Sequence, residues 1–136
     1  MKITIQAHVK APIAAVWQAW TTPDDIVQWN NASDDWHTPY ARADIREGGT
    51  FLSRMEARDG SAGFDFEGTY TRVVPHQAID YVMSDGRSAE TTFTPEHGGV
   101  TIRTTFDAET EHSAEMQQQG WQAILDSFTR HVENTA

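Results

Sequence analysis

The chain has 136 residues, no cysteine and a formal net charge of -10, because 20 acidic side chains face 10 basic ones. This length suits one domain, residues 1–136, and the lack of cysteine excludes disulfide frameworks and thiolate metal sites. The negative charge argues against nucleic acid as a partner, and without a secretory signal or a long apolar run we expect a cytoplasmic protein with no membrane insertion.

The N-terminal part of the sequence predicts a strand followed by two helices. Apolar side chains alternate with polar ones along Lys2–Val9, which indicates a half-buried strand. Pro12 suits the first turn of a helix, and Thr22-Pro23 interrupts that helix, so we predict a helix pair over Pro12–Trp29. Asn30–Pro39 is rich in Asn, Ser, Asp and Pro, and this composition predicts a loop.

The stretch from Arg42 to Phe106 predicts six strands joined by tight turns. The turn signals are Gly48-Gly49, Asp59-Gly60, Asp85-Gly86 and Gly98-Gly99, since such pairs tolerate positive φ. Consecutive strands joined in this way form an antiparallel meander. The predicted strands are Arg42–Arg46, Thr50–Ala57, Phe64–Val74, Gln77–Ser84, Ser88–Thr94 and Val100–Phe106. Alternation along them puts apolar side chains on one face of the sheet and charged side chains on the other.

Residues Ser113–Asn134 predict one long amphipathic helix, with Ser113 as its N-cap. The apolar stripe of this helix comprises Trp121, Leu125, Phe128 and Val132. Gln117 projects into the same stripe, so its amide must find a partner or face a polar cavity. We interpret Gly120 as a position where the helix packs closely against its neighbours, with Trp121 wedged beside it.

Several short motifs, in this order, resemble those of a known superfamily. They are Ala11-Pro12 with Val16-Trp17, Trp29, Glu47-Gly48-Gly49-Thr50-Phe51, Phe66-Glu67-Gly68-Thr69-Tyr70, Phe93 before Gly98-Gly99-Val100-Thr101, and Gly120-Trp121 with Leu125. The chain is similar to the helix-grip (Bet v 1/START-like, SRPBCC) superfamily, and most similar to bacterial proteins related to the C-terminal domain of the activator of Hsp90 ATPase. The resemblance implies an α+β fold, in which a curved antiparallel sheet of about seven strands wraps the C-terminal helix and leaves an internal cavity.

This resemblance leaves three functions open, because it rests on fold positions rather than on reacting groups. The first is binding of a small hydrophobic or aromatic ligand in the cavity, which the nearly uncharged inner face of the predicted sheet favours. The second is a polyketide cyclase or related aldol-type enzyme, which needs a base in the pocket; His37 and Asp35 are the weak candidates. The third is a regulatory interaction with a chaperone of the Hsp90 type.

The residues expected to contact a ligand are mostly aromatic, with a few groups that form hydrogen bonds. They are Trp17, Trp29, Trp36, Met55, Phe64, Phe66, Tyr70, Tyr81, Phe93, Met116, Gln117, Gly120 and Trp121, with Ser53 and Thr104 as further polar groups. We expect no cofactor and no metal. His112 and Glu115, with Glu109 or Glu111 nearby, have metal-ligand spacing, but an acidic helix N-terminus explains them. The edges of the sheet permit a homodimer, although no interface is indicated.

Overall fold

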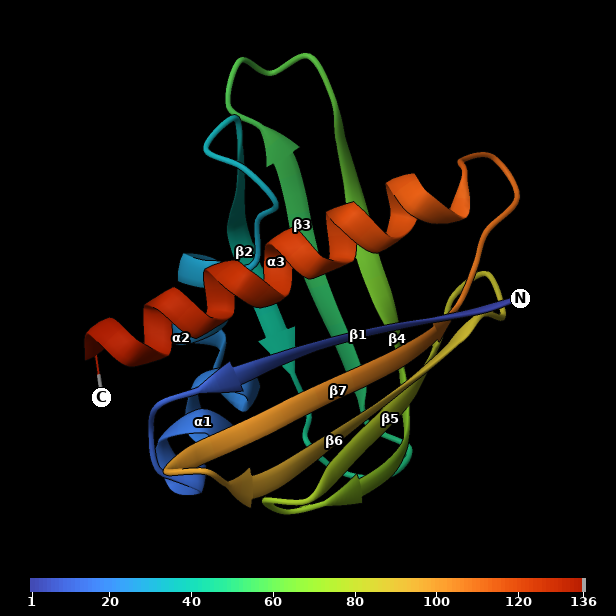
Figure 1. Cartoon of the computed structure of the whole chain (residues 1–136). Helices are drawn as coiled ribbons and strands as arrows, with labels where there is room; N and C mark the ends of the chain where they lie inside the picture. The colour runs from blue at the N-terminus through green and yellow to red at the C-terminus, as the bar shows by residue number, and fades with distance from the viewer. Residues whose placement is uncertain (136) are drawn as a thin grey trace.

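The computed structural model describes residues 1–135 as one curled sheet, two short helices and one long helix (Figure 1). The strands are β1 (Lys2–Val9), β2 (Trp36–Ala43), β3 (Thr50–Ala57), β4 (Gly63–Val74), β5 (Ala78–Met83), β6 (Ser88–Glu96) and β7 (Gly99–Asp107). The helices are α1 (Ile13–Thr21), α2 (Pro23–Trp29) and α3 (Ala114–Thr135). The predicted order of elements is therefore confirmed.

All strand pairs of the sheet are antiparallel, in the order β1-β7-β6-β5-β4-β3-β2. The six strands β2–β7 form the predicted meander, and β1 adds to its far side by pairing with β7. The sheet curls around α3, which crosses its concave side (Figure 1). Gly68 lies where strands approach closely, since a side chain there would collide with the Val82 carbonyl and the ring of Phe51.

The two halves of α3 are packed differently. In the C-terminal half, Leu125, Phe128 and Val132 are buried in the core. Trp20 of α1 and Trp29 of α2 contact Phe128 edge-on, with ring centroids 5.0 and 4.9 Å away, so the helix pair closes one end of the curl. In the N-terminal half, the helix contacts β1 and β7, but the cavity described below separates it from β3, β4 and β5.

The N-terminal ends of the helices follow from local chemistry. The Ser113 hydroxyl accepts a hydrogen bond of 3.1 Å from the Met116 backbone N–H, so the predicted N-cap of α3 is confirmed. Pro12 precedes α1 instead of lying in its first turn, and its carbonyl accepts from the N–H groups of Ala15 and Val16. Pro23 occupies the first turn of α2, where its missing N–H needs no partner.

The prediction of a loop over Asn30–Pro39 and of a strand over Arg42–Arg46 is wrong in its boundaries. Strand β2 already begins at Trp36 and ends at Ala43. Pro39 is tolerated because β2 is an edge strand and its pairing with β3 shifts register between His37 and Tyr40. Thr38 is only 3% exposed, and its hydroxyl donates to the Asn30 carbonyl, so this polar segment is ordered by burial.

Both edges of the sheet carry features that oppose pairing with another strand. At the β1 edge, Gln118 and Gln122 of α3 donate from their side-chain amides to the carbonyls of Thr4 and Gln6, at 3.4 and 3.0 Å. At the β2 edge, Pro39 and the register shift interrupt the strand. Such devices reduce strand addition, so edge pairing is a poor route to the expected homodimer. Within residues 1–135, no helix is both long enough and apolar enough to cross a membrane.

Candidate ligand-binding cavity

A cavity of about 440 Å³ lies between the N-terminal half of α3 and the inner face of the sheet. Small-molecule sites in proteins usually have volumes of about 300–1,000 Å³. Ten of the residues expected to contact a ligand line this cavity: Trp29, Met55, Phe64, Phe66, Tyr70, Tyr81, Met116, Gln117, Gly120 and Trp121. Most of the residues that the sequence pattern selected therefore lie on the wall.

The sheet side of the cavity is a cluster of aromatic rings around Phe51. The ring centroids of Tyr81, Tyr70 and Phe66 lie 4.9, 5.2 and 5.6 Å from that of Phe51. These residues come from β3, β4 and β5, so three adjacent strands build one continuous surface. Phe51 also lines the cavity, although the sequence analysis placed it only on the inner face of the sheet.

On the helix side, Trp121 fixes the distance between α3 and the sheet. Its ring stacks on Phe106 of β7, with centroids 3.8 Å apart and planes inclined by 7°. Two flat rings in contact act as a spacer, because neither can be compressed. The Trp121 ring also meets Phe66 at 6.2 Å, which joins the helix side of the wall to the aromatic cluster.

Gly120 lies on the cavity wall, and the prediction that it serves close helix packing is wrong. A Cβ atom added at this position would meet no atom of the described residues within 4 Å. On the helix surface, Gly120 lies between Met116 and Ile124, which both line the cavity. A side chain here would therefore project into free space on the cavity side of α3.

The cavity reaches the surface beside the first turn of α3. Met116 on the helix and Phe64 at the start of β4 both line the cavity, yet they are 60% and 48% exposed. A large apolar side chain that is both cavity wall and molecular surface marks an opening. We call the opening between Met116 and Phe64 the mouth.

The amide of Gln117 is buried and fully engaged by the segment between β7 and α3. Its Oε1 accepts a hydrogen bond of 2.8 Å from the Glu109 N–H, and its Nε2 donates to the carbonyls of Glu109 and His112, at 3.1 and 2.9 Å. A weaker contact of 3.4 Å reaches the Ser113 carbonyl. The sequence left open whether this amide has a hydrogen-bond partner or faces a polar cavity, and the structure shows backbone partners. Gln117 therefore holds the segment between β7 and α3 in place over the cavity.

The hydroxyls of Ser53, Tyr70 and Tyr81 are different, because none of them forms a hydrogen bond with any residue in the range 1–135. All three residues line the cavity. Burial raises the pKa of both tyrosines well above the usual value, so the phenols remain protonated at neutral pH. The other hydroxyl pair on the wall, Thr91 and Thr104, is satisfied internally at 2.8 Å.

Three ionisable side chains that the sequence analysis did not assign to the cavity lie on its wall. Arg87 donates from Nε to Asp85 at 2.7 Å. Glu109 accepts from the His112 N–H at 2.7 Å and contacts His112 Nδ1 at 3.1 Å, and the hydrogen bond from His112 lowers the pKa of Glu109. The sequence could not place Glu109 and His112 on the wall, because the fold of their segment depends on the Gln117 hydrogen bonds.

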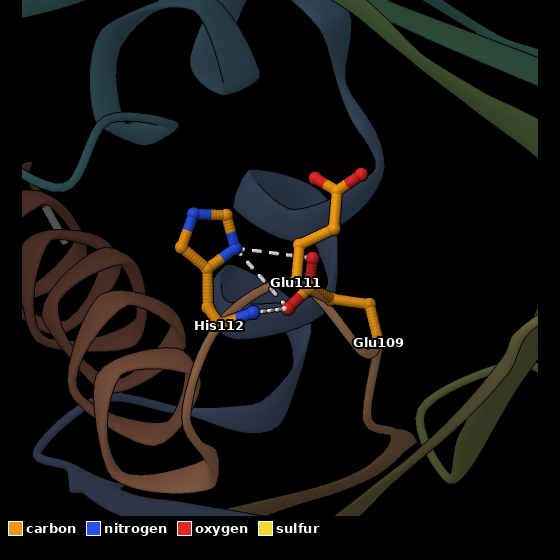
Figure 2. Close-up of side chains that lie close together, drawn as sticks. All are labelled: Glu109, Glu111 and His112. Carbon is orange, nitrogen blue, oxygen red and sulfur yellow. Dashed lines mark hydrogen bonds and ion pairs between the residues drawn. The ribbon is translucent and has the colours of Figure 1, made fainter.

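Glu109, Glu111 and His112 form a cluster with ligand atoms within 4.8 Å of one another (Figure 2). Figure 2 shows the Glu109 carboxylate turned toward the imidazole and backbone of His112. Glu111 and His112 are exposed to solvent. Hydrogen bonds from His112 to the Glu109 carboxylate hold these two residues together ahead of the α3 N-terminus.

The remaining three residues expected to contact a ligand lie outside the wall. Trp17 packs edge-on against Phe93, at 5.5 Å, inside the core beneath α1. Trp36 contacts Phe64 at 6.0 Å and borders a separate polar hollow with Asp35 and Arg58. The cavity does not extend to Trp17, Trp36 or Phe93.

The two weak catalytic candidates also lie outside the cavity. Met55 lines the cavity, so its neighbour Glu56 points to the opposite face of the sheet. His37 is the register partner of Glu56, and its Nε2 lies 3.8 Å from the Glu56 carboxylate on that outer face. Asp35 is exposed, and its carbonyl accepts from the Arg58 N–H. Neither group can serve as a base for a molecule in the cavity.

Comparison with known proteins gives one family and a set of similar structures. The family model described as Activator of Hsp90 ATPase homolog 1-like protein matches residues 10–133. The AHSA1-like protein from Aeromonas hydrophila is 53% identical, with a TM-score of 0.92 over 98% of this chain and 93% of that one. Chr148 from Cytophaga hutchinsonii is 44% identical, with a TM-score of 0.85 over 98% and 92%.

More distant structures agree in fold alone. NE0264 from Nitrosomonas europaea is 17% identical, with a TM-score of 0.86 over 100% of this chain and 96% of that one. No curated protein matches the chain significantly. The resemblance to the helix-grip superfamily inferred from the sequence is confirmed.

Proposed function

The chain belongs to the family of Activator of Hsp90 ATPase homolog 1-like proteins, and we propose that it binds a small hydrophobic or aromatic molecule in the cavity between its sheet and α3. The observation that carries this proposal is a cavity of about 440 Å³ between sheet and helix, lined mainly by apolar and aromatic side chains. Protein interiors are close-packed, and empty volume forfeits contacts that stabilise the fold. A ligand of matching shape restores those contacts.

Gly120 supports the proposal independently of the volume. Glycine in the middle of a helix destabilises it by about 1 kcal/mol relative to alanine. No neighbouring atom requires glycine at this position, since an added Cβ meets nothing within 4 Å among the described residues. The absence of a side chain therefore benefits the cavity rather than the packing of α3.

The chemistry of the wall favours binding over catalysis. The aromatic cluster offers a large apolar surface, and the free hydroxyls of Ser53, Tyr70 and Tyr81 offer a few hydrogen bonds. Such a combination is typical of sites that orient an apolar ligand. The proposed catalytic bases His37 and Asp35 lie outside the cavity.

One observation favours an enzyme as the second candidate. His112 lines the cavity, and the Glu109 carboxylate contacts its Nδ1, which leaves Nε2 free to accept a proton. This pair could serve an aldol-type reaction of a bound carbonyl compound. Solvent exchange of acidic C–H protons of a bound ketone, lost in His112→Gln and retained in His37→Gln, would favour this activity.

A regulatory interaction with a chaperone is the third candidate, and it rests on the family description alone. A cavity too small for a ligand, together with a large exposed apolar patch, would favour this function. The observed volume favours ligand binding instead.

Native mass spectrometry of the protein purified from its own host tests the proposed function. We expect a reproducible small-molecule adduct on the wild type and on Gly120→Ala, whose methyl group leaves most of the volume free. Gly120→Leu, whose larger side chain takes up part of the cavity, should weaken the adduct while keeping the circular dichroism spectrum of the wild type. An adduct-free wild type from several growth conditions, recovered together with a chaperone, would contradict the proposal.

A further inference from the structure

The free phenols on the wall indicate which chemical group of a ligand this cavity recognises. Tyr70 of β4 and Tyr81 of β5 are register partners on the inner face of the sheet. The Phe51 ring packs against both, at 5.2 and 4.9 Å. The two hydroxyls are close enough that the charge of an ionised Tyr70 would raise the pKa of Tyr81.

Neither hydroxyl has a hydrogen-bond partner in residues 1–135. Neither oxygen is completely buried, because Asp80 Oδ1 is the only completely buried side-chain polar atom without a partner in this range. The hydroxyls therefore reach open space within or at the rim of the cavity. A wholly apolar ligand would remove solvent from these hydroxyls without replacing its hydrogen bonds, so a ligand that accepts hydrogen bonds there gains more.

The surrounding charge argues against an anionic acceptor. Arg87 is the cationic side chain of the wall, and its Nε is already bound to Asp85 at 2.7 Å. Glu109 lies on the same wall, and the whole chain carries a net charge of -10. Burial is the main cause of the raised pKa of Tyr70 and the charge of Asp44 adds to it, whereas the charge of Arg87 opposes the rise at Tyr81. A carboxylate or phosphate entering the cavity would meet net repulsion.

We propose that the Tyr81 hydroxyl, with Tyr70 beside it, donates a hydrogen bond to a neutral carbonyl oxygen, so that the ligand is an uncharged apolar molecule bearing a carbonyl group. A carbonyl oxygen has two lone pairs and can accept from both phenols at once. The apolar part of the ligand then lies against Phe51, Phe66 and Trp121, and Gly120 leaves room for it. This inference rests on the proposed function.

Three probes with the same ring system test the inference. They are 2-acetylnaphthalene labelled with ¹³C at the carbonyl, 2-ethylnaphthalene, which lacks the oxygen, and 2-naphthoate, which is anionic. Binding of each is measured by calorimetry to the wild type, Tyr81→Phe and Tyr70→Phe. These substitutions remove only a hydroxyl, so 2-ethylnaphthalene serves as the control for an intact cavity.

We expect the ketone to bind more tightly than the hydrocarbon and the carboxylate, and Tyr81→Phe to weaken it about threefold to tenfold, as for loss of one neutral hydrogen bond. The hydrocarbon should bind both proteins within about twofold. The carbonyl ¹³C resonance should lie further downfield in the wild-type complex than in the Tyr81→Phe complex.

Two results would overturn the inference while leaving the proposed function intact. One is a carbonyl resonance at the same position in both complexes. The other is equal weakening of ketone and hydrocarbon by Tyr81→Phe. Failure of all three probes to bind the wild type would instead contradict the proposed function, and the inference with it.

Discussion

Trp121 of α3 lies flat on Phe106 of β7, with ring centroids 3.8 Å apart, and this contact sets the spacing between the helix and the sheet at the edge of the cavity. Further along the helix, Leu125 and Phe128 pack directly into the core. The C-terminal half of α3 is therefore anchored in the core, whereas the N-terminal half borders the cavity. The cavity opens to the surface between Met116 and Phe64.

Replacing Trp121 should test this spacer. We expect Trp121→Ala to lower the free energy of unfolding by about 3 kcal/mol, because a large ring is lost and a void remains. Trp121→Phe, which keeps a stacking ring, should lose less than half as much. Chemical denaturation followed by circular dichroism measures both; equal losses would show that stacking on Phe106 is unimportant.

Adding a methyl group at Gly120 should raise the stability of the fold and reduce the volume of the cavity. Gly120→Ala is expected to raise the free energy of unfolding by about 1 kcal/mol, since alanine is the better helix former and meets no neighbour. If Gly120→Ala were destabilising, the position would be packed after all, and the account of the cavity wall would fail.

The Gln117 hydrogen bonds should control the segment before α3. Gln117→Leu leaves the Glu109 N–H and the His112 carbonyl without their partner, which should cost about 1–3 kcal/mol. Amide hydrogen exchange should accelerate in residues 109–117 and not in β3. Gln118→Leu is the matched control on the same helix, because Gln118 makes only one long contact, at 3.4 Å.

Asp107 should stabilise the fold at neutral pH and lose this effect in acid. Its carboxylate accepts from Lys2 Nζ at 2.7 Å and from the Ser88 N–H at 2.9 Å, and these bonds hold its pKa below the usual value. A depressed folded-state pKa gives stability that is complete above the unfolded pKa of about 3.9 and is lost as pH falls through the folded pKa. Asp107→Asn should thus be destabilising at pH 7, and its deficit should shrink below about pH 4.

Asp80 should show the opposite dependence. It lies on the outer face of the sheet, and burial raises its pKa, with the charge of Glu90 adding to the effect and Arg72 opposing it. Its Oδ1 is buried without a hydrogen-bond partner among residues 1–135. The resulting penalty is absent at low pH and grows as pH rises from the unfolded toward the folded pKa. Asp80→Asn should therefore be stabilising at pH 7 and neutral near pH 3; thermal unfolding at both pH values checks this.

The sequence predicted the fold well because the signals were local. Alternation along β1 and β3–β7, glycine turns such as Gly48-Gly49, and the apolar stripe of α3 each require only neighbouring residues to interpret. Strand β2 was misplaced because its first half contains His37, Thr38 and Pro39, which are typical of a loop; burial of Thr38 and pairing with β3 order this segment. That pairing is not visible in local composition.

The cavity was predicted only in part, since its shape depends on distances between elements. Alternation of apolar and polar residues along the strands predicted which side chains lie on the inner face of the sheet. It could not show that Phe93 packs against Trp17, whereas Phe66 and Tyr81 line the cavity. Gly120 was assigned to close packing because a helix glycine commonly has that role, and only the position of the sheet reveals the free volume beside it. Likewise, the partners of Gln117 come from the folded segment ahead of the helix.

The most direct test of the proposed function uses the four methionines of the chain as reporters. Met55 and Met116 line the cavity, whereas Met83 is buried outside it and Met1 is exposed at the N-terminus. With ¹³C-methyl methionine and 2-acetylnaphthalene as the added probe, saturable shifts of the Met55 and Met116 methyl resonances, with those of Met1 and Met83 unchanged, are the predicted result. Shifts confined to Met1, equal shifts of all four, or none at any probe concentration would contradict binding between the sheet and α3.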